Sequence, residues 1–162
     1  MRLTPLVAAS FALILGGCSP GAGDANPAST QAAPAVHPVS GLAVVPLTVT
    51  HGSARHVFRV EVAASTPEQA RGLMFRTEMG ADEGMIFPMD PPRPASFWMK
   101  NTVMSLDLLF IGVDGRITNI AANAVPYSEA PLFSAGLVKA VLELNAGRAA
   151  QLGIVAGDRV EW

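Results

Sequence analysis

The sequence predicts one mainly β domain, an antiparallel sandwich or barrel with one or two short helices. Three observations lead to this prediction. Roughly seven short segments have strand-like patterns, helical signals are confined to two short segments, and no internal repeat is present. The chain has 162 residues and half of them are apolar, so it has room for one ordinary domain with a hydrophobic core.

The first two strands are predicted at residues 42–50 and 56–63. The first segment is rich in β-branched residues and ends at the turn signal His51-Gly52. In the second segment apolar residues alternate with charged ones such as Glu61, which is the pattern of a half-buried strand. The two segments therefore predict a hairpin in which Glu61 faces away from the core.

A short helix is predicted to follow the second strand. Thr66 is expected to be its N-cap, Pro67 its first residue and Gln69 the residue that closes a capping box. Gly72 interrupts the helical pattern, and residues 76–84 show no periodicity.

The second half of the chain predicts further short strands separated by turns. Asp114-Gly115 is a hairpin signal, and a helical turn at residues 148–152 is expected to end at Gly153. Residues 89–95, which are rich in proline, and residues 123–133 are predicted to be loops. The predicted strands are residues 85–87, 96–103, 106–111, 116–122, 138–144 and 159–162.

The N-terminus has the three parts of an export signal. Arg2 precedes an apolar run over Leu3–Leu15, which has the size of a signal peptide and is too short to span a bilayer. Leu15-Gly16-Gly17-Cys18 then resembles the bacterial lipobox. The resemblance implies cleavage after residue 17 and lipidation of Cys18, whereas the alternative is an ordinary secretory signal with an incidental cysteine.

Lipidation would make the bilayer the first partner of this protein. Several acyl chains give stable anchoring, and lipidation would leave no free thiol because Cys18 is the sole cysteine. By similarity to lipoprotein sorting signals, Ser19 favours an outer-membrane location that faces the periplasm. Residues 18–41 are therefore predicted to be a lipidated, flexible tether, and residues 42–162 the globular domain.

Composition and motifs argue against several functions. The net charge of −2 makes nucleic acid an unexpected partner. Hydrolase, phosphate-loop and paired-cysteine motifs are missing from the sequence, so we expect no cofactor. Six of the seven methionines lie between Met74 and Met104; they favour core packing over Cu(I) binding because their spacing shows no tight pairing. His51 and His56 are interpreted as incidental rather than as a metal site, and no metal is expected.

The candidate functional residues fall between residues 71 and 107. On the predicted strand 96–103, Trp98 and Lys100 share one face, where they either bind an anionic or sugar-like ligand or form a solvated surface. Asn101 lies on the opposite face, where it is expected to satisfy the backbone of a neighbouring loop or to take part in binding.

The charged candidates of this region admit two interpretations. Arg71, Arg76 and Lys100 supply cations, while Glu83 and Asp107 supply anions. Asp107 interrupts an otherwise apolar strand and is expected to need a cationic or hydrogen-bonding partner. These residues form either a structural salt-bridge network or an anion-binding pocket.

A series of short motifs runs through residues 71–158 of the chain. They are Arg71-Gly72-Leu73-Met74-Phe75-Arg76, Gly84-Met85-Ile86-Phe87, Phe97-Trp98-Met99-Lys100-Asn101-Thr102, Leu106-Asp107 with Phe110-Ile111, Val141-Leu142-Glu143-Leu144 with Ala146-Gly147, Gly153-Ile154 and Gly157-Asp158. In these motifs the chain resembles, from about Val45 to Trp162, the uncharacterised family named domain of unknown function 192. The resemblance implies a compact, mainly β sandwich of jelly-roll type, often exported and without an established activity.

These observations lead to one functional hypothesis and two alternatives. The leading hypothesis is a membrane-tethered module that binds a small polar or anionic ligand of the cell envelope. One alternative is a hydrolase-like enzyme that uses Asp107 or Glu83 as acid or base, and the other is a structural or partner-binding lipoprotein. The expected ligand-binding residues are Arg71, Arg76, Glu83, Trp98, Lys100, Asn101 and Asp107.

Overall fold

The computed structural model describes residues 35–162. The predicted signal peptide, Cys18 and most of the predicted tether lie outside the described residues. Within residues 35–162, no helix is long and apolar enough to cross a membrane. The described residues form the strands β1 (Ala35–Val36), β2 (Ala43–His51), β3 (Ala54–Val62), β4 (Glu83–Phe97), β5 (Leu106–Gly112), β6 (Ile117–Ala124), β7 (Leu132–Asn145) and β8 (Arg159–Glu161), and the helices α1 (Thr66–Arg71) and α2 (Arg148–Gln151).

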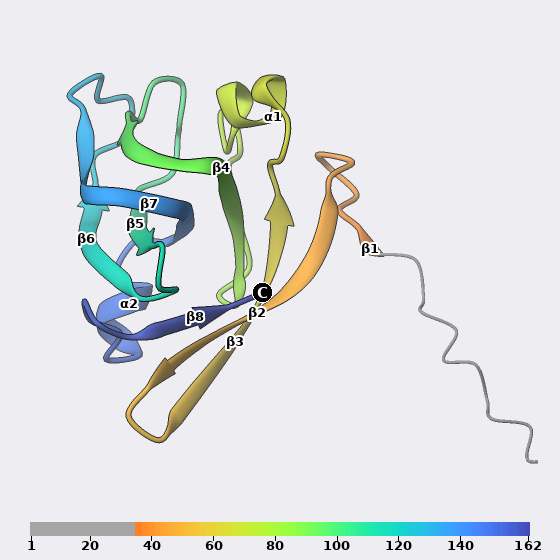
Figure 1. Cartoon of the computed structure of the whole chain (residues 1–162). Coiled ribbons are helices and arrows are strands. Elements are labelled where there is room, and N and C mark those ends of the chain that lie inside the picture. Colours follow the sequence, from red (N-terminus) through yellow and green to blue (C-terminus); the bar gives the residue numbers. More distant parts are fainter. Residues whose placement is uncertain (1–34) are drawn as a thin grey trace, which may run out of the picture. The chain divides into compact units, whose positions relative to one another are not determined.

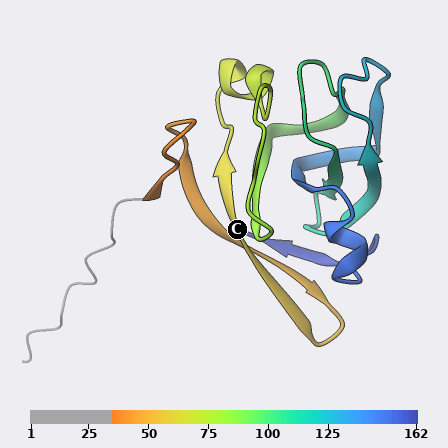
Figure 2. The ribbon, with the colours of Figure 1, turned by 180° about the vertical axis from the view of Figure 1, so that it is seen from behind.

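The strands belong to one curled sheet, which confirms the mainly β prediction. Their order is β1-β2-β3-β4-β7-β5-β6, with β8 paired to β2 outside this path. All of these pairs are antiparallel except β3 with β4, which run parallel. Figures 1 and 2 show the sheet bending into a half-barrel, with α1 at one end of the sheet and α2 at the other.

Both faces of the sheet are buried. One face carries a cluster that includes Phe58, Ile86 and Leu109, and α2 contributes Ala149 to it. The other face carries Phe87, Phe110 and the methionines Met85, Met89 and Met99, as expected for methionines used in core packing. This second face is covered in part by the segment between β3 and β4, which contributes Leu73 and Met79.

The helix α1 begins one residue earlier than predicted. Ser65, not Thr66, is the N-cap, and Glu68 rather than Gln69 closes the capping box. The carboxylate of Glu68 accepts hydrogen bonds from the backbone amides of both Ala64 and Ser65, at 2.9 and 2.7 Å. A charged acceptor makes a stronger bond than the neutral amide of Gln69 could, so this register is preferred.

Two further predictions around β4 were wrong. Residues 89–95 are not a loop, because β4 continues through them and pairs with β7 across register shifts. Residues 96–103 are not a strand, because β4 ends at Phe97 and the chain turns at Lys100 and Asn101. Asn101 has φ of +57°, a left-handed conformation that interrupts a strand.

Residues 35–41, which were assigned to the tether, form β1 and a hydrogen-bonded turn. The amide of His37 donates to the carbonyl of Leu42 at 2.8 Å, and the amide of Gly41 donates to the carbonyl of His37 at 2.9 Å. This turn lies against the segment that follows β3, and the two together enclose the cavity described next.

Candidate functional site

A cavity lies between the turn at residues 37–42 and the segment 67–83. Its volume is about 700 Å³, within the usual range for small-molecule sites. Of the seven predicted ligand-binding residues, Arg71, Arg76 and Glu83 line this cavity. The other four lie elsewhere and are considered in turn below.

A buried ion pair lies beside this cavity, and its arginine, Arg76, is a lining residue. Arg76 donates two hydrogen bonds to Glu61, with Nη1 and Nη2 each 3.0 Å from a carboxylate oxygen. Only about 10% of the Arg76 side chain and 4% of the Glu61 side chain are exposed. Ser40 also donates to Glu61, and Nδ1 of His37 lies 3.6 Å from the same carboxylate. Glu61 therefore links the turn at residues 37–42 to Arg76.

Two other carboxylates of the cavity are held by backbone amides. Glu68 caps α1, and the hydrogen bond from the Ser65 amide lowers the pKa of its carboxyl group below the ordinary value. Glu83 accepts a hydrogen bond of 2.9 Å from the amide of Gly80. Glu78 lines the cavity and is exposed.

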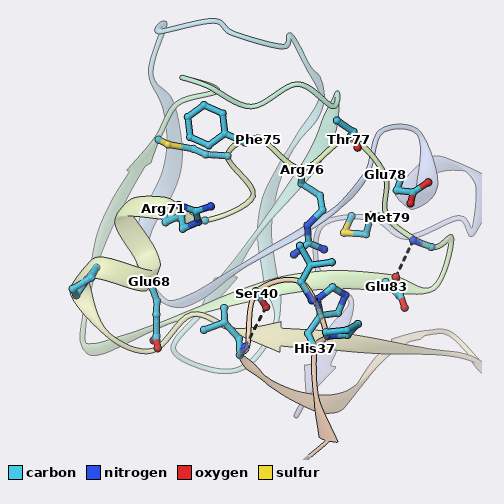
Figure 3. Close-up of a pocket in the computed structure, with 17 residues that line it drawn as sticks. His37, Ser40, Glu68, Arg71, Phe75, Arg76, Thr77, Glu78, Met79 and Glu83 are labelled. Carbon is cyan, nitrogen blue, oxygen red and sulfur yellow. Dashed lines mark hydrogen bonds between the residues drawn. The ribbon is translucent and has the colours of Figure 1, made fainter.

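Arg71 differs from Arg76 because its charge is not used in the fold. It lies at the C-terminal end of α1 and is exposed. Within residues 35–162, no ion pair or side-chain hydrogen bond engages its guanidinium group. Figure 3 shows Arg71 on one side of Arg76, with Glu78 and Glu83 on the other side.

Asn101 supports the cavity without lining it. Its carbonyl accepts a hydrogen bond of 2.9 Å from the amide of Phe75, and its Nδ2 lies 3.8 Å from Sδ of Met74. Phe75 and Met74 are both lining residues, and Phe75 has φ of +65°. The bond to the neighbouring loop is thus made by the main chain of Asn101, whereas its side chain, which was predicted to satisfy that backbone, contacts Met74.

Trp98 and Lys100 are close together, but in a loop rather than on a strand. The ammonium group of Lys100 lies 5.1 Å from the Trp98 ring centroid and 3.6 Å from a carboxylate oxygen of Glu129. Neither residue lines the cavity. Trp98 and Lys100 therefore lie on a surface that is separate from the cavity.

Asp107 lies on the opposite face of the sheet, and of the two kinds of partner predicted for it, cationic or hydrogen-bonding, the structure supplies the hydrogen-bonding kind. Its carboxylate accepts hydrogen bonds from the amides of Asn123 and Ala149, at 2.9 and 3.0 Å. The side chain is fully buried and faces the cluster that contains Leu144, its register partner on β7. Asp107 thus anchors the start of α2 and does not contribute to the cavity.

Sequence patterns did not reveal the residues beside the cavity that link its two segments. Glu61 was assigned to a solvent-facing side because alternation predicts one exposed face, whereas both faces of this sheet are covered. His37 and Ser40 were assigned to the tether.

Glu143 is another buried acid that sequence patterns did not reveal, and burial raises the pKa of its carboxyl group to about 8.

Comparison with known proteins places this fold in a family. Residues 47–162 match the family model DUF192, described as "Uncharacterized ACR". The chain therefore belongs to this family, as its motifs predicted. A comparison with curated proteins finds no match.

Two solved structures are similar to this one. A protein of unknown function from Novosphingobium aromaticivorans DSM 12444 is 64% identical, with a TM-score of 0.79 over 82% of this chain and 94% of that one. A protein from Sinorhizobium meliloti 1021, described as a candidate transcription regulator, is 44% identical, with a TM-score of 0.72 over 74% of this chain and 94% of that one.

Proposed function

We propose that this member of the DUF192 family is an exported lipoprotein whose domain binds a small polar ligand. The cavity between residues 37–42 and 67–83 is the proposed binding site. The observation that carries the proposal is Arg71, an exposed cation on the wall of a cavity whose other arginine is already paired. An unpaired guanidinium is a ready partner for a carboxylate or phosphate group.

The lining indicates the chemistry of the ligand more closely. Arg71 can hold an anionic group, and Glu78 and Glu83 can accept hydrogen bonds from an amino group on the other side of Arg76. Leu42, Met74 and other apolar residues form the remaining wall. We infer a zwitterionic ligand with a small apolar body and separated charges, such as a short peptide.

A thermal-shift screen of residues 35–162 tests this proposal. Short peptides are expected to raise the melting temperature, because a ligand that binds the native state stabilises it. Simple anions serve as the comparison set, since they engage Arg71 alone. A rise with anions and none with zwitterions would contradict the inferred ligand class.

The role of Arg71 is tested with a matched pair of variants. Arg71→Gln should lower affinity for the screened ligand about tenfold or more, since charge-assisted hydrogen bonds contribute about 1.5–3 kcal/mol. Arg93→Gln is the control, because Arg93 is also exposed but lies on β4 outside the cavity. Equal affinities of the two variants would remove Arg71 from the site.

The anchor is proposed from the lipobox pattern alone, because Cys18 lies outside the described residues. Cys18→Ala should release the protein from membranes and abolish labelling by a fatty-acid probe. Membrane association that persists without label would contradict lipidation at this residue.

The enzyme alternative is narrowed by the positions of its two carboxylates. Asp107 uses both oxygens on backbone amides and faces away from the cavity, so it is a poor candidate for acid or base. Glu83 lines the cavity, so the enzyme alternative can be tested at this residue. If Glu83 acts as acid or base, Glu83→Gln should abolish any turnover of a bound ligand.

A further inference from the structure

Three loops at one end of the domain are joined by backbone hydrogen bonds. The amide of Phe75 donates to the carbonyl of Asn101, and the amide of Tyr127 donates to the carbonyl of Thr102. The amide of Met99 donates to the carbonyl of Ser128 at 2.8 Å. Figure 1 shows the loops that follow β4 and β6 at the same end of the sheet as α1. The three loops therefore form one continuous surface.

This surface exposes large apolar side chains. Phe75 is 62% exposed, Trp98 48% and Tyr127 61%, and they are joined by Val103 and Val125. We name these five residues the aromatic loop surface. It holds three of the five exposed aromatic residues within residues 35–162, the others being Phe133 and Trp162.

The backbone keeps these side chains outward at a conformational cost. Phe75 and Tyr127 both have positive φ, as does Asn101 between them. Non-glycine residues rarely adopt this conformation, and when they cluster they often mark a functional surface. Nothing in the core requires Phe75 or Tyr127 there, because both side chains point into solvent.

We propose that the aromatic loop surface docks on a lipid bilayer. Tryptophan and tyrosine are the residues enriched at the interface between headgroups and acyl chains, because each joins an apolar ring to a polar group. Lys100 lies over Trp98 with its ammonium group 3.6 Å from a carboxylate oxygen of Glu129, in an exposed pair, and its long stem lets the ammonium group reach the headgroups while the ring inserts. Exposed apolar patches mark contact sites for membranes or for other protein chains, so self-association is one outcome of the test below.

Docking in this way would bring the proposed ligand site close to the bilayer. Phe75 belongs both to the aromatic loop surface and to the lining of the cavity. The inference does not rest on lipidation or on the proposed ligand, because it concerns the domain alone. Both hydrophobic clusters lie within residues 42–162, so residues 35–162 form the folded unit and can be tested without an anchor.

The two tryptophans allow a direct test with vesicles of phosphatidylethanolamine and phosphatidylglycerol. Each tryptophan lies under a lysine, Trp98 under Lys100 and Trp162 under Lys139 at 4.9 Å. In residues 35–162 with Trp162→Phe, Trp98 is the sole tryptophan. Its emission should shift to shorter wavelength on vesicle addition and be quenched by brominated acyl chains. In the matched variant with Trp98→Phe, emission from Trp162 should not change.

Cosedimentation with the same vesicles measures the contribution of the rings. Phe75→Ser with Trp98→Ser and Tyr127→Ser should lower the bound fraction roughly tenfold, because apolar burial drives interfacial binding. The control carries Phe133→Ser with Trp162→Ser. Both residues are exposed outside the aromatic loop surface, so this variant should bind the vesicles as the unaltered domain does. Circular dichroism establishes that both variants are folded.

Three outcomes would overturn the proposal. The first is the absence of any emission shift for Trp98, and the second is equal binding by the two sets of variants. The third is self-association of the domain in sedimentation velocity that is lost with the same three substitutions, since the surface would then contact a second copy of this chain.

Discussion

Two buried glutamates on the same face of the sheet have opposite surroundings. Glu61 on β3 and Glu143 on β7 are register partners of Met85, which lies between them on β4. Both are almost fully buried. Glu61 is paired with Arg76, whereas Glu143 has no ion pair or side-chain hydrogen bond within residues 35–162, and burial raises its pKa to about 8.

The comparison shows two ways of accommodating a carboxyl group in a core. The carboxyl group of Glu61 has a guanidinium group and a hydroxyl group as hydrogen-bond partners, which replace the lost water. Glu143 gives up its charge by retaining a proton, since nothing compensates the desolvation of the anion. Only the ion pair of Glu61 with Arg76 joins two segments of the chain, and this pair lies beside the cavity.

The largest effect is expected from breaking the charged arrangement. Arg76→Met leaves Glu61 buried without its cation, which should lower the free energy of unfolding by about 3–5 kcal/mol. Urea denaturation at neutral pH measures this loss. Adding Glu61→Gln to the same chain should recover part of it, because no buried charge then remains. A loss below about 1 kcal/mol would mean that the pair is solvated.

The uncharged arrangement predicts a dependence of stability on pH. Because the folded pKa of Glu143, about 8, lies above the ordinary 4.5, the folded state holds a proton that the unfolded state has released between these values. The contribution of Glu143 to the free energy of unfolding is therefore complete below about pH 4.5. It falls by about 1.4 kcal/mol per pH unit as the pH rises to about 8.

Glu143→Gln should remove this part of the pH dependence and be more stable than the native chain at pH 8. Urea denaturation of both chains between pH 5 and 8 measures the difference, with Glu61→Gln as the matched variant. Parallel pH profiles for Glu143→Gln and the native chain would show that Glu143 is already charged.

A smaller effect is expected at Asp107, the third buried acid, whose partners are backbone amides. Asp107→Ala leaves the buried amide of Ala149 without an acceptor, which should cost about 1–3 kcal/mol. Amide hydrogen exchange should become faster in α2, and ligand affinity at the cavity should not change. An affinity loss would contradict its placement on the opposite face.

The smallest effect is expected where the charged pair is exposed. Lys100→Ala removes a contact of 3.6 Å with Glu129 that lies in solvent, so stability should fall by less than about 1 kcal/mol. Thermal unfolding of this variant beside Arg76→Met gives the contrast between an exposed and a buried pair. Similar losses of stability in the two variants would contradict the expected difference between an exposed and a buried pair.

The sequence predicted the strands whose patterns arise locally. Hairpin turns at Gly52 and Gly115 and the alternation in β3 placed most strands within a few residues of their observed bounds. The Pro-rich half of β4 was missed because proline cannot donate a ladder hydrogen bond, and yet register shifts let this segment pair with β7. Such shifts depend on the partner strand and leave no local signal.

The candidate site was predicted only where its residues are close together in the sequence. Arg71, Arg76 and Glu83 fall in one segment and do line one cavity. The opposite wall comes from residues 37–42, and the ion pair comes from Glu61, so neither could be inferred from spacing. Asp107 was grouped with the site because it is near in sequence, although strand alternation turns it to the other face of the sheet.

The pairing of β8 with β2 has a consequence for the timing of folding. Thr50 pairs with Arg159, more than a hundred residues later, and Val49 pairs with Val160. Contacts so distant in sequence slow folding, because a long loop must close before they form. One edge of β2 thus stays open until β8 has been synthesised, so the sheet can be completed only at the end of synthesis.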